Sequence, residues 1–538
     1  MMQNVRCSNG KKRMPVMLIF KKGARACALL IFVWAFLVLL LPSLAAWKRP
    51  RYILIIDGGS SGTRSYAFSY TMSQSEPLLP VFQGIPPSAA LAKVPHKQGT
   101  GMYDRVETQP GMGDLLDDPS GIKDKALQPL LEWGKASVPQ RQHACTPVLL
   151  LATGGARSLS QENREQLLQR ARHVLGDGPF VFQPDWARII SGTSEGAFSF
   201  VAQAYSRGLL RSIQGGHSLE KGGGLQEQPH QPALGILDLG GSSLEVTTNQ
   251  LHQLRRMDAH ASPVAVPINV TVGDAEIQLS TTTYKHCGLM ATWDRSISLL
   301  LQGAEGINAD KSPEIQSPCL HKGFSAPYKR LLTYGIAPTI TTVQLLGAPE
   351  EQQCAKLVQA LVKPCTSALQ GQGEYVGISG FFVISQFLSV ASHVPANPSY
   401  EDMHVLARKF LSMPWHQVKS QLGHHVNVEK YALWGTYAPT LLGPDGFNLS
   451  SKQVTIGTKD MSWPLGAAIV EVSERLAAGP TSDLSGTCSA GMGSSGSSFL
   501  GSTVLVAMFV LLKILASYAF FSYLRHRARI PMRSLEEV

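Results

Sequence analysis

The chain has 538 residues, enough for two ordinary domains or three small ones, and its 44% hydrophobic content is that of a globular protein. Its formal net charge of +10 lies at the two ends: residues 1–25 carry seven basic side chains and no acid, and residues 513–538 carry five basic and two acidic ones. The body between them is neutral overall, so the charge gives no support to a nucleic-acid-binding function.

Two apolar segments bracket the body and predict a membrane protein. Residues 26–46 are uncharged for about 20 residues, long enough to cross a bilayer. A cleaved signal peptide is the alternative, because residues 43–46 are mostly small, but the long basic lead-in and the long apolar core favour an uncleaved anchor. Residues 499–524 form a second candidate span, in which Lys513 is costly but tolerated if it snorkels or pairs; an amphipathic tail helix is the alternative.

The basic ends also predict a topology. Positively charged flanks stay on the cytoplasmic side of a membrane, so we expect residues 1–25 and 525–538 in the cytoplasm. The body would then be lumenal or extracellular. The sequons at Asn269 and Asn448 are consistent with glycosylation on that side.

Six cysteines lie in the body, and none has the CxxC spacing of a zinc site. In an oxidising lumen, proximity in sequence alone predicts two disulfides. These are Cys354–Cys365 and Cys287–Cys319.

The first predicted strand, residues 51–57 (RYILIID), is rich in isoleucine and ends on Asp57. Five small residues follow at 58–62, and residues 65–70 (SYAFSY) alternate as a return strand. The segment predicts a β-hairpin whose tip allows the backbone to approach a ligand closely.

A short buried strand and two helices come next. Residues 148–153 (VLLLAT) predict the strand, and Ser158 with Gln161 has capping-box spacing for the first helix. That helix has one apolar face, made of Leu167, Leu168, Ala171, Val174 and Leu175. A second helical face in SGTSEGAFSFVAQAY places Glu195 near a helix start.

Residues 236–246 (ILDLGGSSLEV) repeat the pattern of the first hairpin: an apolar strand, an aspartate, Gly-Gly-Ser-Ser, and an alternating strand. A period of about 180 residues is too long for a solenoid and predicts two duplicated domains. A loop rich in Gly, Gln and Pro at 215–232 precedes the repeat. A Gly/Ser-rich stretch at 477–498 predicts a flexible stalk before the second span.

The two small-residue loops predict an anion site, because successive backbone N–H groups can form a concave anion-binding surface. A carboxylate directly before such a loop would repel a bare phosphate unless a hydrated divalent cation lay between them. We therefore interpret Asp57 and Asp238 as acids on the metal side, and the loops as two phosphate clamps that face each other. A plain hairpin tip is the alternative for either loop alone. Neither loop has the GxxxxGK[ST] pattern of a P-loop.

Five segments occur in a characteristic order: IDGGSSGTRSY, LLATGGARSL, ISGTSEGAFSFV, LDLGGSSLEV and SWPLGAA. They resemble the five conserved regions of the ecto-nucleoside triphosphate diphosphohydrolase family, the apyrases of the GDA1/CD39 type, in a plant-type, membrane-bound form. The resemblance covers roughly residues 52 to 470, nearly the whole body.

The resemblance implies an α/β fold of the actin, Hsp70 and sugar-kinase superfamily, in which two ribonuclease-H-like domains flank a cleft. The first domain would comprise residues 50–190 and 456–476, and the second residues 191–455. A transmembrane helix would lie at each end.

The resemblance also implies a reaction. Glu195 matches the family's general base, and Thr153 and Ser243 would orient the attacking water. A Ca²⁺ or Mg²⁺ ion would bridge the phosphates of a nucleoside di- or triphosphate. It would be held through water by Asp57, Asp238 and Glu245.

The terminal phosphate would lie between the two loops. The phosphate-binding residues implied are Gly59, Ser60, Ser61, Gly62, Thr63, Arg64, Gly240, Gly241, Ser242 and Ser243.

The chain departs from the family pattern at two places beside the chemistry. Ser194 stands where the family usually has a second acid before the base, and Glu245 stands where it usually has glutamine. Glu245 adds negative charge beside the metal and is expected to alter its affinity or selectivity.

The residues that would bind the nucleobase match the family pattern less well. Val383 falls where an aromatic base-stacker is expected, which leaves Phe382 beside it and Tyr437 as base-stacking candidates, against the alternative that both rings are core. Ala432 replaces a family cysteine, so we expect Cys145 or Cys488 to lack a partner.

The leading hypothesis is a membrane-bound apyrase that hydrolyses phosphoanhydride bonds and releases orthophosphate. A cytosolic kinase or chaperone-like ATP binder is disfavoured by the two spans and the sequons. A non-catalytic, nucleotide-binding scaffold is the other alternative, and the retained Glu195 argues against it. The cell surface, the Golgi and other secretory membranes all fit, no nucleic-acid partner is expected, and oligomerisation through the spans is allowed.

Overall fold

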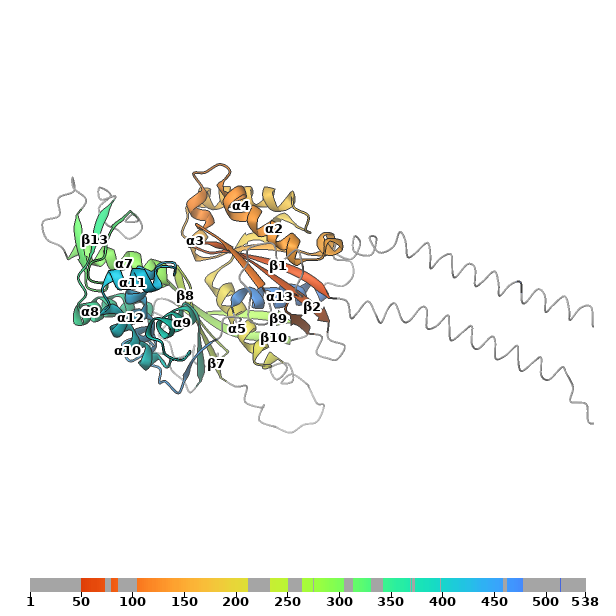
Figure 1. Ribbon diagram of the computed structural model, residues 1–538. Helices are drawn as coiled ribbons and strands as arrows, with labels where there is room; N and C mark the ends of the chain where they lie inside the picture. The colour runs from red at the N-terminus through yellow and green to blue at the C-terminus, as the bar shows by residue number, and fades with distance from the viewer. Residues whose placement is uncertain are drawn as a thin grey trace, which may run out of the picture.

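The computed structural model describes residues 50–72, 79–85, 104–210, 233–249, 264–273, 275–303, 313–329, 342–367, 369, 373–396, 398–457, 462–477 and 513. Over these residues the chain is an α/β protein with two six-stranded sheets and one three-stranded sheet (Figure 1). Within the described segments, every helix is too short or too polar to cross a bilayer. The predicted spans at 26–46 and 499–524 lie outside them, apart from Lys513.

The first sheet is built around the predicted hairpin. Its strands are β1 (Arg51–Gly58), β2 (Thr63–Met72), β3 (Pro80–Gln83), β4 (Asp104–Thr108), β5 (Val148–Ala152) and β6 (Ala187–Ile189). Their order is β3-β2-β1-β5-β6, with β4 also paired to β2. The β1–β2 pair is antiparallel, whereas β5 and β6 continue the sheet in parallel.

The second sheet repeats this arrangement. Its strands are β7 (Leu234–Leu239), β8 (Ser243–Thr248), β9 (Val266–Val272), β10 (Ala275–Lys285), β14 (Glu374–Ser379) and β15 (Val454–Ile456), in the order β15-β14-β7-β8-β10-β9. β7 has an antiparallel neighbour in β8 and a parallel one in β14, as β1 has in β2 and β5. The repeat in the sequence is therefore matched by a repeat in topology.

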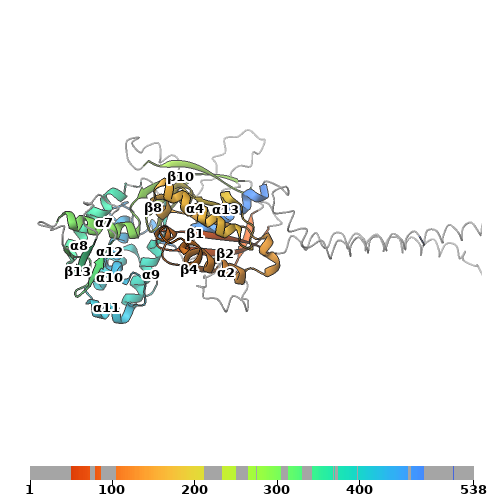
Figure 2. The same cartoon turned by 90° about the horizontal axis from the view of Figure 1, so that it is seen from above.

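The remaining elements cluster at the two ends of the molecule (Figures 1 and 2). Near the first sheet are α2 (Gln128–Ser137), α3 (Gly154–Arg157) and α4 (Gln161–Gly176). The other end holds α7 (Leu289–Gln302), α8 (Glu351–Val362), α9 (Gly380–Ser392), α10 (Tyr400–Leu411), α11 (Trp415–Leu422), α12 (Tyr431–Leu442) and the small sheet of β11 (Glu314–Ser317), β12 (Ser325–Tyr328) and β13 (Val343–Gly347).

Two helices connect the large sheets. α5 (Gly192–Ser206) packs against β7, β8 and β10, and α13 (Trp463–Ala477) packs against α5 and β1. One apolar cluster includes Ile53 of β1, Ile236 of β7 and both helices, so the two halves share a core. β1 is buried on both faces, because Leu54 and Ile56 pack in a second cluster with α2 and α4, which explains its unbroken apolar sequence.

The predicted helix caps need one correction. The cap of α4 is Ser160, whose side chain accepts a hydrogen bond from the Asn163 backbone N–H. Ser158 lies two residues before the cap, and its hydroxyl donates to the Gly154 carbonyl at 3.0 Å. The predicted apolar face of α4 is confirmed, since its five members are buried.

Both predicted disulfide pairings are wrong. The bonds are Cys287–Cys365 and Cys319–Cys354, with Cα–Cα distances of 5.6 and 5.0 Å. Cys354 lies in the first turn of α8 and Cys365 beyond its end. Eleven residues of helix separate Cα atoms by about 16 Å, beyond the reach of a disulfide. Cys145 is also disulfide-bonded, so it is not a cysteine without a partner. Cys488 lies outside the described residues.

Candidate active site

The two small-residue loops lie against each other, as predicted. A Cβ atom added to Gly241, in the β7–β8 loop, would lie 2.3 Å from the Oγ of Ser60, in the β1–β2 loop. Ser60 also contacts the start of α3, since a Cβ at Gly155 would lie 2.6 Å from its Cα. Glycine is thus required at position 155 by the close approach of backbone, whereas the atom nearest Gly241 is the end of the Ser60 side chain. Thr63, by contrast, is fully buried at the start of β2.

Four carboxylates from four elements are buried beside the loops. Asp57 ends β1, Asp238 lies near the end of β7, Glu245 lies on β8, and Glu195 lies in the first turn of α5. Each is at most 6% exposed. Because charged carboxylates are costly to bury without compensation, such a group indicates a functional site rather than a stability element.

The negative charge of Asp57 is offset by the guanidinium of Arg64. Arg64 Nη1 lies 3.6 Å from Asp57 Oδ2, and Arg64 Nη2 donates to Glu107 Oε1 at 2.9 Å. Burial raises the pKa of Asp57 to about 6, while the Arg64 guanidinium opposes the rise. The other oxygen, Oδ1, is buried without a hydrogen-bond partner among the described residues.

Asp238 is held by a hydroxyl rather than a cation. Ser199 Oγ, four residues after Glu195 in α5, donates to Asp238 Oδ2 at 2.5 Å. Burial raises the pKa of Asp238, and hydrogen bonds from Ser199 and Ser379 oppose that rise. Asp238 and Asp57 therefore occupy equivalent strand ends with different support.

Glu195 is fixed by the geometry of a helix start. Ser191 caps α5, its side chain accepting from the Ser194 backbone N–H, so Ser194 takes part in the cap. Arg157 Nη1 donates to Glu195 Oε2 at 2.9 Å. Burial raises the pKa of Glu195 to about 7, and Arg157 opposes the rise, which gives a carboxylate suited to accept a proton near neutral pH.

Arg157 joins Glu195 to the second loop. Its Nη2 donates to Ser243 Oγ at 3.0 Å and lies 3.3 Å from Glu245 Oε1. Ser243 Oγ in turn donates to Glu245 Oε1 at 2.6 Å. No sequence pattern assigned a role to Arg157, although this residue ends the small-residue segment TGGAR after the buried strand β5.

Comparisons with known proteins identify the family of the chain. Residues 44–481 match the sequence model of the GDA1/CD39 (nucleoside phosphatase) family. The chain belongs to this family. The resemblance inferred from the five segments is thereby confirmed, and with it the assignment to the nucleoside phosphatases.

Similar proteins within the family include plant and animal members. The chain is 26% identical to "Probable apyrase 7" of Arabidopsis thaliana, over 83% of this chain and 60% of that protein. It is 25% identical to "Ectonucleoside triphosphate diphosphohydrolase 8" of Rattus norvegicus, over 77% of this chain and 81% of that protein. A nucleoside triphosphate hydrolase from Neospora caninum shares the fold, with a TM-score of 0.51, 14% identity and coverage of 84% of this chain and 98% of that structure.

The donor set fits a divalent cation held through water. In the described part of the chain, no three His, Cys, Asp or Glu side chains are grouped closely enough to ligate a metal directly. Two buried carboxylate oxygens, Asp57 Oδ1 and Glu245 Oε2, have no hydrogen-bond partner among the described residues. Carboxylate oxygens are suitable for hard cations such as Ca²⁺ and Mg²⁺, and Mg²⁺ usually keeps several waters.

Tyr437 is not a base-stacking residue. Its ring is fully buried and its hydroxyl donates to the Cys287 carbonyl at 2.8 Å, so it presents no face to a ligand. Phe382 is partly exposed at the start of α9. That helix start approaches the second loop, since a Cβ at Gly380 would lie 2.6 Å from the Leu239 carbonyl oxygen. Phe382 therefore stays a prediction.

Proposed function

We propose that this chain is an apyrase: a divalent-cation-dependent hydrolase that releases orthophosphate from nucleoside di- and triphosphates. One observation carries the proposal. The buried carboxylate of Glu195 is joined through a single guanidinium, that of Arg157, to Ser243, which directly follows the second loop. A base is thus connected to the place where two anion-binding loops meet.

The loops would bind the terminal phosphate through backbone N–H groups, aided by the hydroxyls of Ser60 and Ser242. Ser243 and Thr153 would orient a water molecule in line with the phosphorus atom. Glu195 would accept its proton as the new P–O bond forms and the bridging P–O bond breaks, so that orthophosphate and the shortened nucleotide are released. A bound Ca²⁺ or Mg²⁺ would neutralise charge on the phosphate oxygens. Asp57, Asp238 and Glu245 would hold that ion through water.

We further propose that the two halves are ribonuclease-H-like domains, residues 50–190 with 456–476 and residues 191–455, that flank the nucleotide-binding cleft. The shared strand order around β1 and β7 supports this division. The contact of Gly241 with Ser60 across the two loops supports a substrate held between the halves.

We also propose that the protein is held in a secretory or surface membrane by residues 26–46 and 499–524, with its body on the lumenal or extracellular side. Two disulfides in the body support an oxidising compartment. Asn269 and Asn448 are both exposed, as glycosylation requires. Protease protection in sealed vesicles, with and without endoglycosidase, would test this topology.

The enzymatic proposal is tested by phosphate release from the detergent-solubilised chain. ADP, UDP, GDP and the matching triphosphates would be supplied with Ca²⁺, with Mg²⁺ or with EDTA. We expect turnover that EDTA abolishes and that either ion restores. A folded, disulfide-bonded protein that binds nucleotide but releases no phosphate would instead indicate a non-catalytic binding protein.

A further inference from the structure

We propose that Arg157 is a positioning residue of the reaction. It holds the general base Glu195 in place and offsets the repulsion between the carboxylates of Glu195 and Glu245. This inference rests on the proposed hydrolase activity and assigns a role to a residue that touches the base rather than the substrate.

The contacts of Arg157 come from two separate segments of the chain, around the start of α5 and on β8. Nη1 donates to Glu195 Oε2 at 2.9 Å and to the Ile190 carbonyl at 3.0 Å, just before α5. Nη2 donates to Ser243 Oγ at 3.0 Å and contacts Glu245 Oε1 at 3.3 Å, on β8. One planar group therefore sets the position of α5's first turn relative to β8.

Two like charges meet at this group. Glu195 and Glu245 are both buried, and Arg157, whose side chain is 22% exposed, is the cation that forms salt bridges with both in the described structure. Removing it would leave two carboxylates facing each other with little water, an arrangement that repels strongly at low dielectric. Glu195 would then rotate away or retain a proton, and either change would disable it as a base.

The geometry requires a guanidinium. An arginine offers several N–H donors in a rigid plane and can serve both carboxylates at once, whereas a lysine is a point charge on a flexible stem. A lysine would keep the charge but could not maintain all the contacts.

The test compares Arg157→Gln, Arg157→Lys, Glu245→Gln and the double variant Arg157→Gln/Glu245→Gln in the full-length protein. Arg170→Gln is the matched control, because Arg170 donates to the carbonyls of Leu116 and Asp118 and pairs with no site residue. The readouts are kcat, KM, the Kd of a non-hydrolysable nucleotide, and Tm.

We expect Arg157→Gln to lower kcat by at least about 100-fold, the usual worth of general-base catalysis, with KM and Kd within about threefold of wild type because binding is not affected. The kcat of Arg157→Lys should lie between those of wild type and Arg157→Gln. Arg170→Gln should change Tm but not kcat. The kcat of the double variant should be higher than expected if the effects of the two single substitutions simply multiplied. Glu245→Gln removes the carboxylate repulsion that Arg157 offsets in the wild type.

The inference is overturned if folded Arg157→Gln keeps kcat within about threefold of wild type, or if the two substitutions multiply independently. If Arg157→Gln does not fold, Arg157→Lys decides: unchanged kcat contradicts the role, and a drop of about tenfold at constant Kd supports it. A wild-type protein without turnover would overturn both the proposed function and this inference, whereas an active wild type with an unaffected Arg157→Gln overturns only the latter.

Discussion

Gly241 and Ser60 touch across the two loops, so that a single added methyl group at position 241 would lie 2.3 Å from the Ser60 Oγ. The contact joins the turn of the first hairpin to the turn of its repeat. Any change that separates these turns would also open the site that they enclose.

Gly155→Ala should abolish most phosphate release, because a Cβ there would lie 2.6 Å from the Ser60 Cα and would displace the backbone of the first loop from this contact. We expect a loss of 10-fold or more in kcat/KM, on the order of a mispositioned reacting group. Gly176→Ala, at the end of α4, is the control: its Cβ would meet only Phe182 Cδ1, at 4.0 Å, so activity should not change. Equal activity in the two variants would show that the loop contact is not needed.

Asp57→Asn should stabilise the protein at alkaline pH while removing metal-dependent activity. The pKa of Asp57 is raised from 3.8 to about 6 by burial, so its contribution to stability is fully present below pH 4 and is lost as the pH rises through about 6. The asparagine variant mimics the protonated form of Asp57 and therefore keeps this contribution to stability at high pH.

In EDTA at pH 8, the expected gain in unfolding free energy is on the order of 2–3 kcal/mol, from about 1.36 kcal/mol per pKa unit. Chemical denaturation of both proteins at pH 4 and pH 8 measures it, and the difference should vanish at pH 4. A variant less stable than wild type at pH 8 in EDTA would contradict the assignment.

The rate should fall on the acid side with the protonation of Glu195. Burial raises the pKa of Glu195 to about 7, and a general base must be unprotonated to act. At saturating substrate, kcat should therefore decrease below pH 7 and approach tenfold loss per pH unit. Since Glu195 and Glu245 share Arg157, the measured value belongs to the pair. A kcat independent of pH between 5 and 8 would exclude Glu195 as the base.

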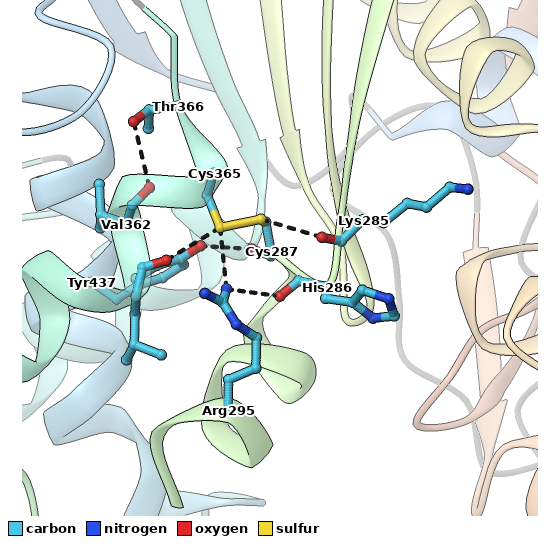
Figure 3. The surroundings of a disulfide bond; sticks show 9 residues. Lys285, His286, Cys287, Arg295, Val362, Cys365, Thr366 and Tyr437 are labelled. Carbon is cyan, nitrogen blue, oxygen red and sulfur yellow. Dashed lines mark hydrogen bonds between the residues drawn. A yellow bond between two sulfur atoms is a disulfide. The ribbon is translucent and has the colours of Figure 1, made fainter. Parts of the chain in front are cut away.

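The disulfide at Cys287 should matter to activity more than the disulfide at Cys319. Tyr437 and Arg295 hold the segment around Cys287 (Figure 3), with the Arg295 Nη1 3.2 Å from the His286 carbonyl oxygen. The next residue, Gly288, packs on the second loop: a Cβ there would lie 2.5 Å from the Gly241 carbonyl carbon. Loss of the bond would thus loosen the support of that loop.

We compare Cys287→Ser/Cys365→Ser with Cys319→Ser/Cys354→Ser. Each pair is expected to reduce stability by about 2–5 kcal/mol, so assays are made at a temperature where both remain folded. The first pair should lose kcat in the folded protein, and the second should keep it. The reverse order would show that the α7 start does not position the loop.

Much of this structure could be predicted from local sequence. The hairpins at 51–70 and 236–246 were evident because an apolar strand, an acid and several small residues leave few alternatives, and Glu195 was placed correctly at a helix start. The misses involve contacts between distant segments. Arg157 meets partners 38 and 86 residues away, and the cysteines pair across 78 and 35 residues. Aromatic identity alone could not show that Tyr437 would be core.

The central claim is that Glu195 is the general base of a phosphohydrolase, and one comparison tests it most directly. Phosphate release is measured for wild type, Glu195→Gln and Glu162→Gln, the last an exposed acid in the first turn of α4. We predict that Glu195→Gln loses at least about 100-fold in kcat with unchanged nucleotide affinity, while Glu162→Gln matches wild type. A folded Glu195→Gln that turns over at the wild-type rate would contradict the account.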